Sequence, residues 1–277
     1  RDWSSDVCSS DLDRTKTSMG ARLLRRWVER PLKSLAPLHQ RLDAVTAFHD
    51  NLMLRAETIK LLSRIPDLER LVNRVRGCYA SPRDLLGLRQ GLGAVPDLLA
   101  LLERHGLPDH AAWLTSELRG SPEICDVIDA ALVDDPPANF DNGGVIRPGY
   151  SAELDGLRDS AGTAREALLG LEKRERDRTG IRSLKVGFNR VFGYYIEVSN
   201  THRELVPADY HRKQTLVGAE RYFTPELKDW ETSILNGQER ALELERDLFR
   251  QICGQVVAGS EVILSTAAAL AAVDVCA

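Results

Sequence analysis

The sequence predicts a mainly α fold, in which a helical core domain extends into a long antiparallel two-helix lever with a small β-rich unit at its tip. Two runs of apolar residues spaced alternately by three and four positions carry this prediction, because that spacing forms the seam of a coiled coil. An alternating segment, 183–202, separates the two runs, so the chain must go out along one helix and return along the other. The first run comprises Leu154, Leu157, Ala161, Ala164, Leu168 and Leu171, and the second comprises Leu227, Trp230, Ile234, Gly237, Ala241, Leu244 and Leu248.

The composition supports a helical protein with a substantial core. Apolar residues make up 43% of the 277 positions, which is enough to bury a core in one or two domains. Aromatic residues make up only 6%, which suits packed helices better than a β-sandwich. The longest apolar stretch, 267–275, is too short to cross a bilayer, so we predict no membrane partner.

Residues 1–12, RDWSSDVCSSDL, read as an in-frame translation of a sequencing-adapter oligonucleotide, and we exclude them from fold prediction. Without Arg1, Asp2, Asp6 and Asp11, the net charge changes from −4 to −2. Four widely spaced cysteines remain, and their spacing fits neither a zinc site nor a disulfide framework. We therefore predict buried, reduced thiols.

Residues 13–150 form the predicted helical core. Short amphipathic runs alternate with Pro and Gly breaks, and several runs begin with Ser-Pro or Asp, which favour helix starts. Thr17 or Ser18 is expected to cap the first helix, and a loop rich in Pro, Gly and Asn, 134–150, follows the last. The predicted helices cover residues 17–30, 36–50, 51–65, 67–78, 81–92, 96–106 and 121–132.

The lever begins with residues 151–180. Its outgoing helix is predicted over 152–178 and stops at Gly180, which gives ~27 residues and ~40 Å. The return segment, 224–277, starts with Thr224 as the N-cap and Pro225 at the first helical position. Its apolar rhythm continues for ~50 residues, or ~75 Å. The second half is expected to re-enter the core, with Val256, Val262, Ile263 and Leu264 buried and with Gly254 or Gly259 as bend points.

The tip covers residues 181–223. Alternation predicts strands over 183–188 and 194–199, joined by a loop at 189–193, with further extended pieces at 214–216 and 221–223. Because an isolated hairpin is marginally stable, we predict three or four strands that share Phe188, Phe192 and the tyrosines. We expect few buried contacts to anchor this unit.

No catalytic constellation is found, so the sequence predicts no enzymatic activity for this chain. The phosphate-binding pattern GxxxxGK, a histidine pair with metal-ligand spacing and a Gly-flanked nucleophilic Ser are all absent from the sequence. We expect no cofactor or metal in these 277 residues.

The tip has three more basic than acidic residues, whereas the whole chain is net acidic. From the charge alone, a solvated loop surface is a slightly better explanation than a binding site. Two further features favour phosphate contacts: Asn189, Gln214 and Thr215 accompany the basic residues in turns, and Gly187, Gly193 and Gly218 permit close backbone approach. The basic residues are Arg182, Lys185, Arg190, Arg203, Arg212, Lys213 and Arg221, and the acidic ones are Glu197, Glu204, Asp209 and Glu220.

Five blocks follow one another along the chain: TKTSMGARLLRRWVERPL, DLERLVNRV, GGVIRPGYSAELDGLR, RTGIRSLKVGFNRVFGYYIEVSN and RKQTLVGAERYFTPELKDWE. Together they resemble the MutS family of DNA mismatch-repair proteins. The resemblance implies that the core and the two lever segments correspond to domain III and that residues 181–223 correspond to the clamp, domain IV. In that family the clamp grips the DNA backbone without reading sequence.

Two loop elements of the clamp are implied to contact DNA. The first comprises Asn189, Arg190 and Val191, and the second comprises Arg212, Lys213, Gln214, Thr215 and Gly218. The chain has Val217 and Gly218 where many family members have a polar residue and Asn. A contact at those two positions would depend on backbone N–H groups.

The resemblance also implies partners and a location. These are double-stranded DNA, a second copy of the parent protein, a MutL-like repair protein, and the bacterial cytoplasm at the nucleoid. ATP and Mg²⁺ are expected in an ATPase domain outside this sequence, as is a mismatch-reading Phe-x-Glu wedge. The alternative is a coiled-coil spacer or protein-interaction arm that does not bind DNA.

Overall fold

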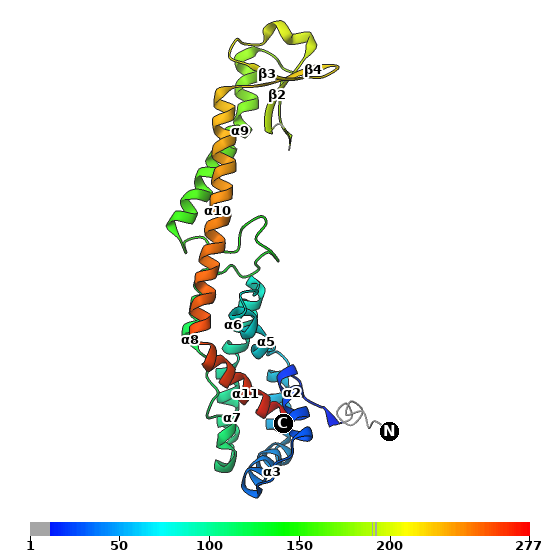
Figure 1. The fold of residues 1–277 in the computed structure, drawn as a ribbon, viewed down its shortest axis with the longest axis vertical. Helices are drawn as coiled ribbons and strands as arrows, with labels where there is room; N and C mark the ends of the chain where they lie inside the picture. Colours follow the sequence, from blue (N-terminus) through cyan, green and yellow to red (C-terminus); the bar gives the residue numbers. More distant parts are fainter. Residues whose placement is uncertain (1–11, 190, 192) are drawn as a thin grey trace. The chain divides into compact units, whose positions relative to one another are not determined.

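The structure is a computed structural model that describes residues 12–189, 191 and 193–277, so the adapter-like residues 1–11 lie outside it. The chain divides into two compact units. The helical unit contains the chain up to Phe140, Gly144–Arg147 and Leu248–Ala277. The lever unit contains Asp141–Gly143 and Pro148–Asp247. Each is described below by itself (Figure 1).

The helices of the helical unit lie within a few residues of their predicted positions. Thr17 caps α2 by accepting a hydrogen bond from the Gly20 N–H, and Asp67 caps α5 in the same way. Ser81 and Asp84 form a reciprocal capping box at the start of α6. The elements are α2 (Ser18–Glu29), α3 (Leu35–Asp50), α4 (Leu52–Leu62), α5 (Leu68–Arg76), α6 (Pro82–Gly93), α7 (Val95–His105), η1 (Asp109–Leu114), α8 (Pro122–Ala131), the end of α10 (Pro225–Ala258) and α11 (Ser260–Cys276).

Helix α11 packs against α2 through one buried carboxylate. Asp274 accepts hydrogen bonds from the Lys16 and Thr17 N–H groups at 2.8 and 2.7 Å. It also accepts one from the Thr17 hydroxyl at 2.6 Å. A Cβ at Gly20 would lie 2.2 Å from the Asp274 carboxylate, so only glycine allows this approach. Residues Leu248–Ala277 belong to the same compact unit as the helices before Phe140.

The return segment is two helices, not the single helix of ~50 residues that the rhythm predicted. Helices α10 and α11 meet at Gly259 with a bend of 61°. A Cβ at Gly259 would lie 2.5 Å from Ile124 Cδ1, so the bend occurs where glycine lets α8 approach. Gly254 lies within α10, which continues past it to Ala258. Val256 and Ile263 are buried as predicted, but Val262 is 38% exposed and Leu264 is half-buried, which corrects the prediction for these two residues.

The prediction of buried thiols was wrong for three of the four cysteines in the described residues. Only Cys276 is buried, and the pKa of its thiol is raised to about 12 by that burial. Cys125 and Cys253 are half-buried, and Cys78 is exposed. All four are free thiols.

One helical stretch of the described residues, Pro82–His105, is long and apolar enough to cross a membrane. The bent pair α10 and α11 passes the same test when taken together. Leu85, Leu88 and Leu98 of the first stretch are fully buried within the helical unit. Its apolar residues therefore serve helix packing, as in any core helix.

In the lever unit, α9 (Ala152–Thr179) lies antiparallel to α10 (Figure 1). Arg158, near the start of α9, pairs with Glu245, whereas Arg174, near its end, pairs with Glu226 at 3.0 Å. Between these pairs, a Cβ at Gly237 would lie 3.5 Å from the Ala161 Cβ, so the backbones approach closely at small residues. The predicted two-helix lever is confirmed.

The tip is a four-stranded antiparallel sheet with strand order β1-β2-β4-β3. Its inner face packs on α9 and α10 through Leu168, Leu171 and Leu227. Ile181, Leu184, Ile196, Val198, Tyr210 and Tyr222 complete this apolar cluster. The strands are β1 (Lys185–Asn189), β2 (Gly193–Ser199), β3 (His211–Thr215) and β4 (Ala219–Phe223), and the 3-10 helix η2 (Asn200–Leu205) follows β2.

Two expectations about the tip need correction. Phe188 is 52% exposed and packs on Tyr194, with ring centroids 4.8 Å apart, rather than filling the cluster. Phe192 lies outside the described residues. The nine buried residues of the cluster also contradict the expectation of few anchoring contacts.

Candidate nucleic-acid interface

The two loop elements implied to contact DNA lie at opposite ends of the sheet. Gly193, the first residue of β2, pairs with Asn189 beside the first turn, whereas Ser199, the last, pairs with Ala219 beside the second. Six residue steps along β2 separate these ends, which is ~20 Å at ~3.3 Å per residue. Any surface that uses both elements must therefore extend along the whole sheet.

The residues of β3 divide between the two faces of the sheet. Arg212 pairs with Tyr222, and Thr215 pairs with Glu220, so both belong to the face that carries the apolar cluster. Gln214 pairs with Arg221 on the outer face. Lys213 lies at a register shift, and its ammonium is 5.7 Å from the centre of the Phe223 ring.

The first turn is ordered by its own side chain. The Asn189 side-chain oxygen accepts a hydrogen bond from the Val191 N–H at 2.8 Å, and the Val191 side chain is 81% exposed. Arg190 lies outside the described residues, so no position can be given for the contact implied for it. The second turn closes with a hydrogen bond from the Leu216 N–H to the Ala219 carbonyl at 2.8 Å, and it exposes Val217 and Gly218.

Two of the three tip glycines make room for the protein's own side chains rather than for a ligand. A Cβ at Gly187 would lie 2.7 Å from the Tyr195 ring. A Cβ at Gly193, which has φ +73°, would collide with the Glu231 carboxylate. Only at Gly218 would an added Cβ meet nothing within 4 Å. Of these three glycines, only Gly218 therefore leaves room for a ligand to come close to the backbone.

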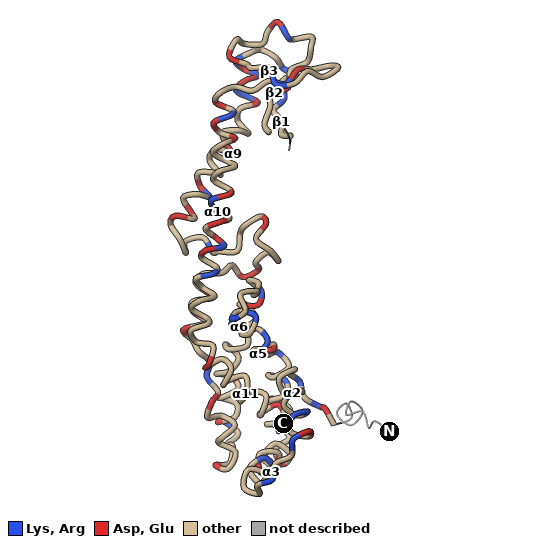
Figure 2. Tube along the Cα trace, in the orientation of Figure 1, with Lys and Arg blue, Asp and Glu red and all other residues tan. Residues whose placement is uncertain are grey.

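Figure 2 marks where Lys, Arg, Asp and Glu lie along the chain. Ion pairs neutralise half of the described basic residues of the tip. Arg221 pairs with Glu197 at 2.9 Å, and Arg203 and Arg212 both approach Glu220, at 3.6 and 3.5 Å. In the described part of the chain, the basic residues of the tip without a carboxylate partner are Arg182, Lys185 and Lys213.

A polar row crosses the outer face of all four strands. Register places Lys185 opposite Glu197, Glu197 opposite Arg221, and Arg221 opposite Gln214. The Arg221 guanidinium also donates to the Gln214 side-chain oxygen at 3.1 Å and lies 4.0 Å from the Tyr195 ring centroid. This row holds Arg221 in place and leaves Lys185 and Gln214 at its two edges.

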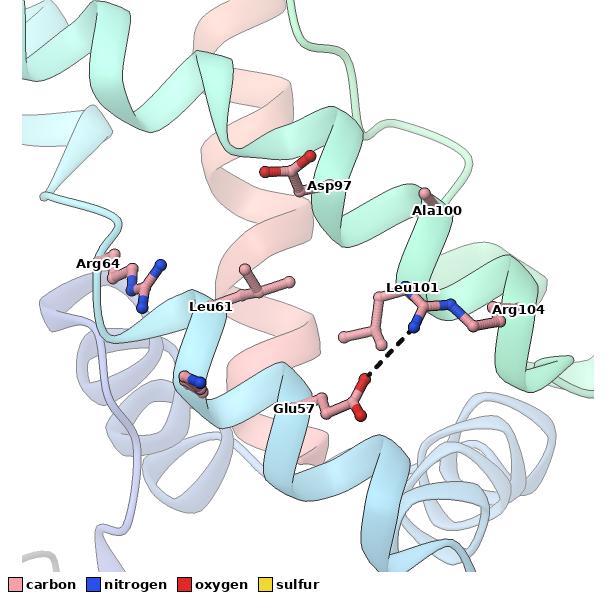
Figure 3. Close-up of a pocket in the computed structure, with 8 residues that line it drawn as sticks. Glu57, Leu61, Arg64, Asp97, Ala100, Leu101 and Arg104 are labelled. Atoms are coloured by element: carbon pink, nitrogen blue, oxygen red, sulfur yellow. Dashed lines mark ion pairs between the residues drawn. The ribbon is translucent and has the colours of Figure 1, made fainter.

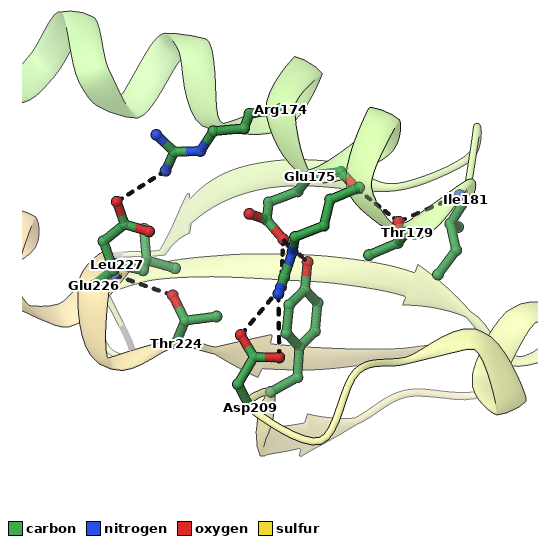
Figure 4. Close-up of polar contacts among 10 residues, drawn as sticks. Arg174, Glu175, Thr179, Ile181, Asp209, Thr224, Glu226 and Leu227 are labelled. Carbon is green, nitrogen blue, oxygen red and sulfur yellow. Dashed lines mark hydrogen bonds and ion pairs between the residues drawn. The ribbon is translucent and has the colours of Figure 1, made fainter.

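Two buried carboxylates lie on the inner side of the tip. Glu175 of α9 accepts a hydrogen bond from the Tyr210 hydroxyl at 2.8 Å and one from Arg178 at 2.8 Å (Figure 4). Arg178 in turn pairs with Asp209 at 3.1 Å. These contacts join the end of α9 to the segment before β3.

Glu220 of β4 is the second buried carboxylate. The hydrogen bond that the Tyr222 hydroxyl donates to it, together with the charges of Arg203 and Arg212, holds the pKa of Glu220 below its usual value. Burial, and then the same hydrogen bond, raises the pKa of Tyr222 to about 12. Neither carboxylate was predicted from the sequence to be a structural centre. The sequence signal that could have indicated them is an acidic residue beside apolar positions. Glu175 has such neighbours in the lever helix, and Glu220 has them in an alternating strand.

A cavity of about 390 Å³ lies between α4 and α7 in the helical unit (Figure 3). Glu57 and Arg104 face each other across it at 3.9 Å. Charges of both signs surround it, so it gives no preference for an anion. The other lining residues are Lys60, Leu61, Arg64, Asp97, Ala100 and Leu101.

The described residues contain no group of three or more His, Cys, Asp or Glu side chains that could hold a metal ion. The sequence has no GxxxxGK loop for nucleotide phosphates. Neither a phosphate-binding loop of this pattern nor a cluster of metal ligands for ATP with Mg²⁺ is therefore present in the described part of the chain.

Comparisons with known proteins indicate the same family over nearly the whole chain. Residues 10–277 match the family model described as MutS domain III. The chain is 46% identical over 266 residues to the DNA mismatch repair protein MutS of Dehalococcoides mccartyi, which covers 95% of this chain and 31% of that protein. The MutS proteins of Salinibacter ruber and Pelotomaculum thermopropionicum are 46% and 44% identical over 96% of this chain, which corresponds to 29% and 31% of their own lengths. The chain thus spans less than a third of the curated relatives it matches.

Proposed function

The chain belongs to the MutS domain III family, and on this basis we propose that it is the core, lever and DNA-clamp segment of a mismatch-repair protein. In this proposal residues 13–150 form the core, 151–180 and 224–277 form the lever, and 181–223 form the clamp. The observation that supports it best is the sheet at the end of the two-helix lever, where Arg182, Lys185 and Lys213 have no carboxylate partner in the described residues.

The contacts proposed for the clamp are with the DNA backbone. Basic side chains, amides and exposed turn backbone suit phosphate oxygens, which carry no sequence information. The two ends of the sheet are ~20 Å apart, and each strand of a duplex carries one phosphate per ~3.4 Å of helix axis, so the sheet is long enough to reach more than one phosphate.

The remaining parts of the proposal concern the whole protein. We propose that it acts in the bacterial cytoplasm at the nucleoid, as a homodimer around the duplex and with a MutL-like partner. ATP and Mg²⁺ would be bound by an ATPase domain outside this chain, to which the lever would transmit the state of the clamp. The chain itself is proposed to lack enzymatic activity.

Fluorescence anisotropy of the full chain with a labelled duplex at 50–300 mM salt tests the clamp. We expect measurable binding that weakens with salt and is equal on matched and mismatched duplexes. The variant Arg182→Gln/Lys185→Gln/Lys213→Gln should reduce the slope of log K against log salt by ~0.9 for each phosphate that the variant no longer neutralises.

The control is Arg30→Gln/Lys33→Gln/Lys60→Gln, which removes the same charges from exposed positions of the helical unit. It should leave the slope unchanged. Binding that is undetectable at 50 mM salt would support the spacer alternative, and a weakening confined to mismatched duplexes would contradict a backbone-only role.

A further inference from the structure

Three hydroxyl side chains converge on one imidazole nitrogen at the end of β2. His202 Nδ1 lies 2.9 Å from the Ser199 hydroxyl, 3.1 Å from the Thr201 hydroxyl and 3.4 Å from the Ser183 hydroxyl. Ser199 also lies 2.9 Å from Thr201 and 3.4 Å from Ser183. Ser183 and Thr201 are exposed, whereas Ser199 and His202 are half-buried. We refer to these four residues as the hydroxyl cluster.

The hydroxyl cluster lies beside the second turn. The Asn200 N–H donates to the Gly218 carbonyl at 3.2 Å, and the Asn200 side-chain amide donates to the Val217 carbonyl at 3.4 Å. That turn is the part of the implied DNA surface without polar side chains, because Val217 and Gly218 occupy it. The chain therefore presents polar side chains next to the place where the family pattern is missing.

The surroundings of the hydroxyl cluster favour an anion. Arg182 and Lys185 flank Ser183 in sequence, and neither has a carboxylate partner in the described residues. Register places Ser199 on the outer face with Lys185, whereas Glu220 lies on the opposite face. The nearby carboxylate of the outer face, Glu197, is paired with Arg221.

We propose that the hydroxyl cluster is a phosphate subsite of the clamp, which holds one backbone phosphate at the end of the sheet where the second turn lies. This proposal rests on the DNA-clamp function above. A neutral imidazole that accepts at Nδ1 carries its proton on Nε2, where it is a donor. One hydroxyl proton satisfies Nδ1, so the other hydroxyls can rotate and donate to phosphate oxygens.

The test is the variant Ser183→Ala/Ser199→Ala/Thr201→Ala in the full chain, measured by anisotropy with the same labelled duplex. We expect affinity to fall by about 5- to 30-fold, because hydrogen bonds to a charged phosphate are stronger than neutral ones. The salt slope should stay unchanged, because no charge is removed. A matched control, Ser160→Ala/Thr163→Ala/Thr232→Ala, removes three exposed hydroxyls from the lever helices and should bind as the parent chain does.

A rescue variant separates a direct phosphate interaction from a structural role. Ser199→Thr/Thr201→Ser keeps both hydroxyls, so it should bind the duplex as the parent chain does. The melting temperature of the alanine variant should match that of the parent chain. A decrease in affinity that follows a lower melting temperature, or a reduced salt slope, would overturn the subsite. If the parent chain binds the duplex and the alanine variant binds equally well, the subsite fails and the clamp stands. If the parent chain does not bind at all, the clamp itself fails.

Discussion

The helical unit and the tip of the lever unit are stabilised in different ways. The helical unit is filled by large apolar side chains that are fully buried, such as Phe48, Leu68, Leu88 and Leu98. The tip has nine buried residues in its apolar cluster and places two buried carboxylates, Glu175 and Glu220, beside tyrosines and arginines. The tip therefore combines an apolar cluster with hydrogen-bonded polar networks, whereas apolar packing dominates the helical unit.

This difference has a consequence for function. The polar networks hold Arg178 to Glu175 at the end of α9, and they hold Arg203, Arg212 and Arg221 to carboxylates of the sheet. Basic side chains that shape the tip are therefore distinct from those available to a phosphate. Net charge alone does not separate these two groups, because both contribute equally to it.

The largest effect is expected in the helical unit. Leu88→Ala should lower the free energy of unfolding by ~2–5 kcal/mol, because a fully buried leucine leaves a cavity among rigid helices. Urea denaturation measures the change. Leu35→Ala, at a position 70% exposed on α3, is the control and should change stability by no more than ~0.5 kcal/mol. Equal effects of the two changes would contradict an apolar-filled helical unit.

A smaller effect is expected from the polar network of the tip. Glu175→Gln should destabilise the tip by ~1–3 kcal/mol, because Arg178 and Tyr210 lose a buried charged acceptor. Amide hydrogen exchange of β3 and β4 measures this change locally. Glu166→Gln on the exposed side of the same helix removes the same charge and should leave exchange unchanged. Unchanged protection in the Glu175 variant would show that the tip depends on its apolar cluster alone.

The two turns of the sheet should respond differently to the same substitution. Gly193→Ala should cost ~1–2 kcal/mol, because it combines a positive φ with a collision with Glu231. Gly218→Ala meets open space and should change stability by no more than ~0.5 kcal/mol. Thermal unfolding followed by circular dichroism compares them. Equal melting temperatures would show that the first turn moves away from α10 without cost.

The smallest effect is a pH dependence centred on Glu220. Its pKa is lower in the folded state, so it stabilises the tip above its unfolded pKa, and this stability is lost as pH falls through the lower folded value. Tyr222 has a folded pKa of about 12, so its contribution is present below its unfolded pKa, near 10, and is lost as pH rises from 10 through 12. Melting temperatures from pH 5 to 3 should fall less steeply in Glu220→Gln than in the parent chain. Identical profiles of melting temperature against pH would show that Glu220 does not cause the pH dependence.

Local sequence signals predicted the helices well. Thr17, Asp67 and Ser81 cap helices through bonds to residues three positions away, so their effect is independent of distant contacts. The apolar seam likewise predicted the antiparallel pairing of α9 and α10, because a stripe of that width needs a partner helix.

At the tip, the accuracy of the predictions depended on contacts that the alternation of apolar and polar residues does not encode. The pattern placed Phe188 among the buried residues, but β1 extends beyond the cluster there, so the ring is half exposed. Gly187 and Gly193 were predicted to admit a ligand, yet Tyr195 and Glu231 fill the space beside them. The strand order, which places the two turns at opposite ends of the sheet, follows from pairing between distant segments.

By itself, the sequence determined the mainly helical class, the two-helix lever, the helix starts and the resemblance to the MutS family. These properties depend on spacing over a few residues or on the order of long similar blocks. Only the tertiary structure decided which basic residues are paired, which glycines are open, and that Ser183, Ser199, Thr201 and His202 meet beside the second turn. The reason is physical: burial, ion pairing and close approach depend on residues far apart in the chain, and folding alone brings them together.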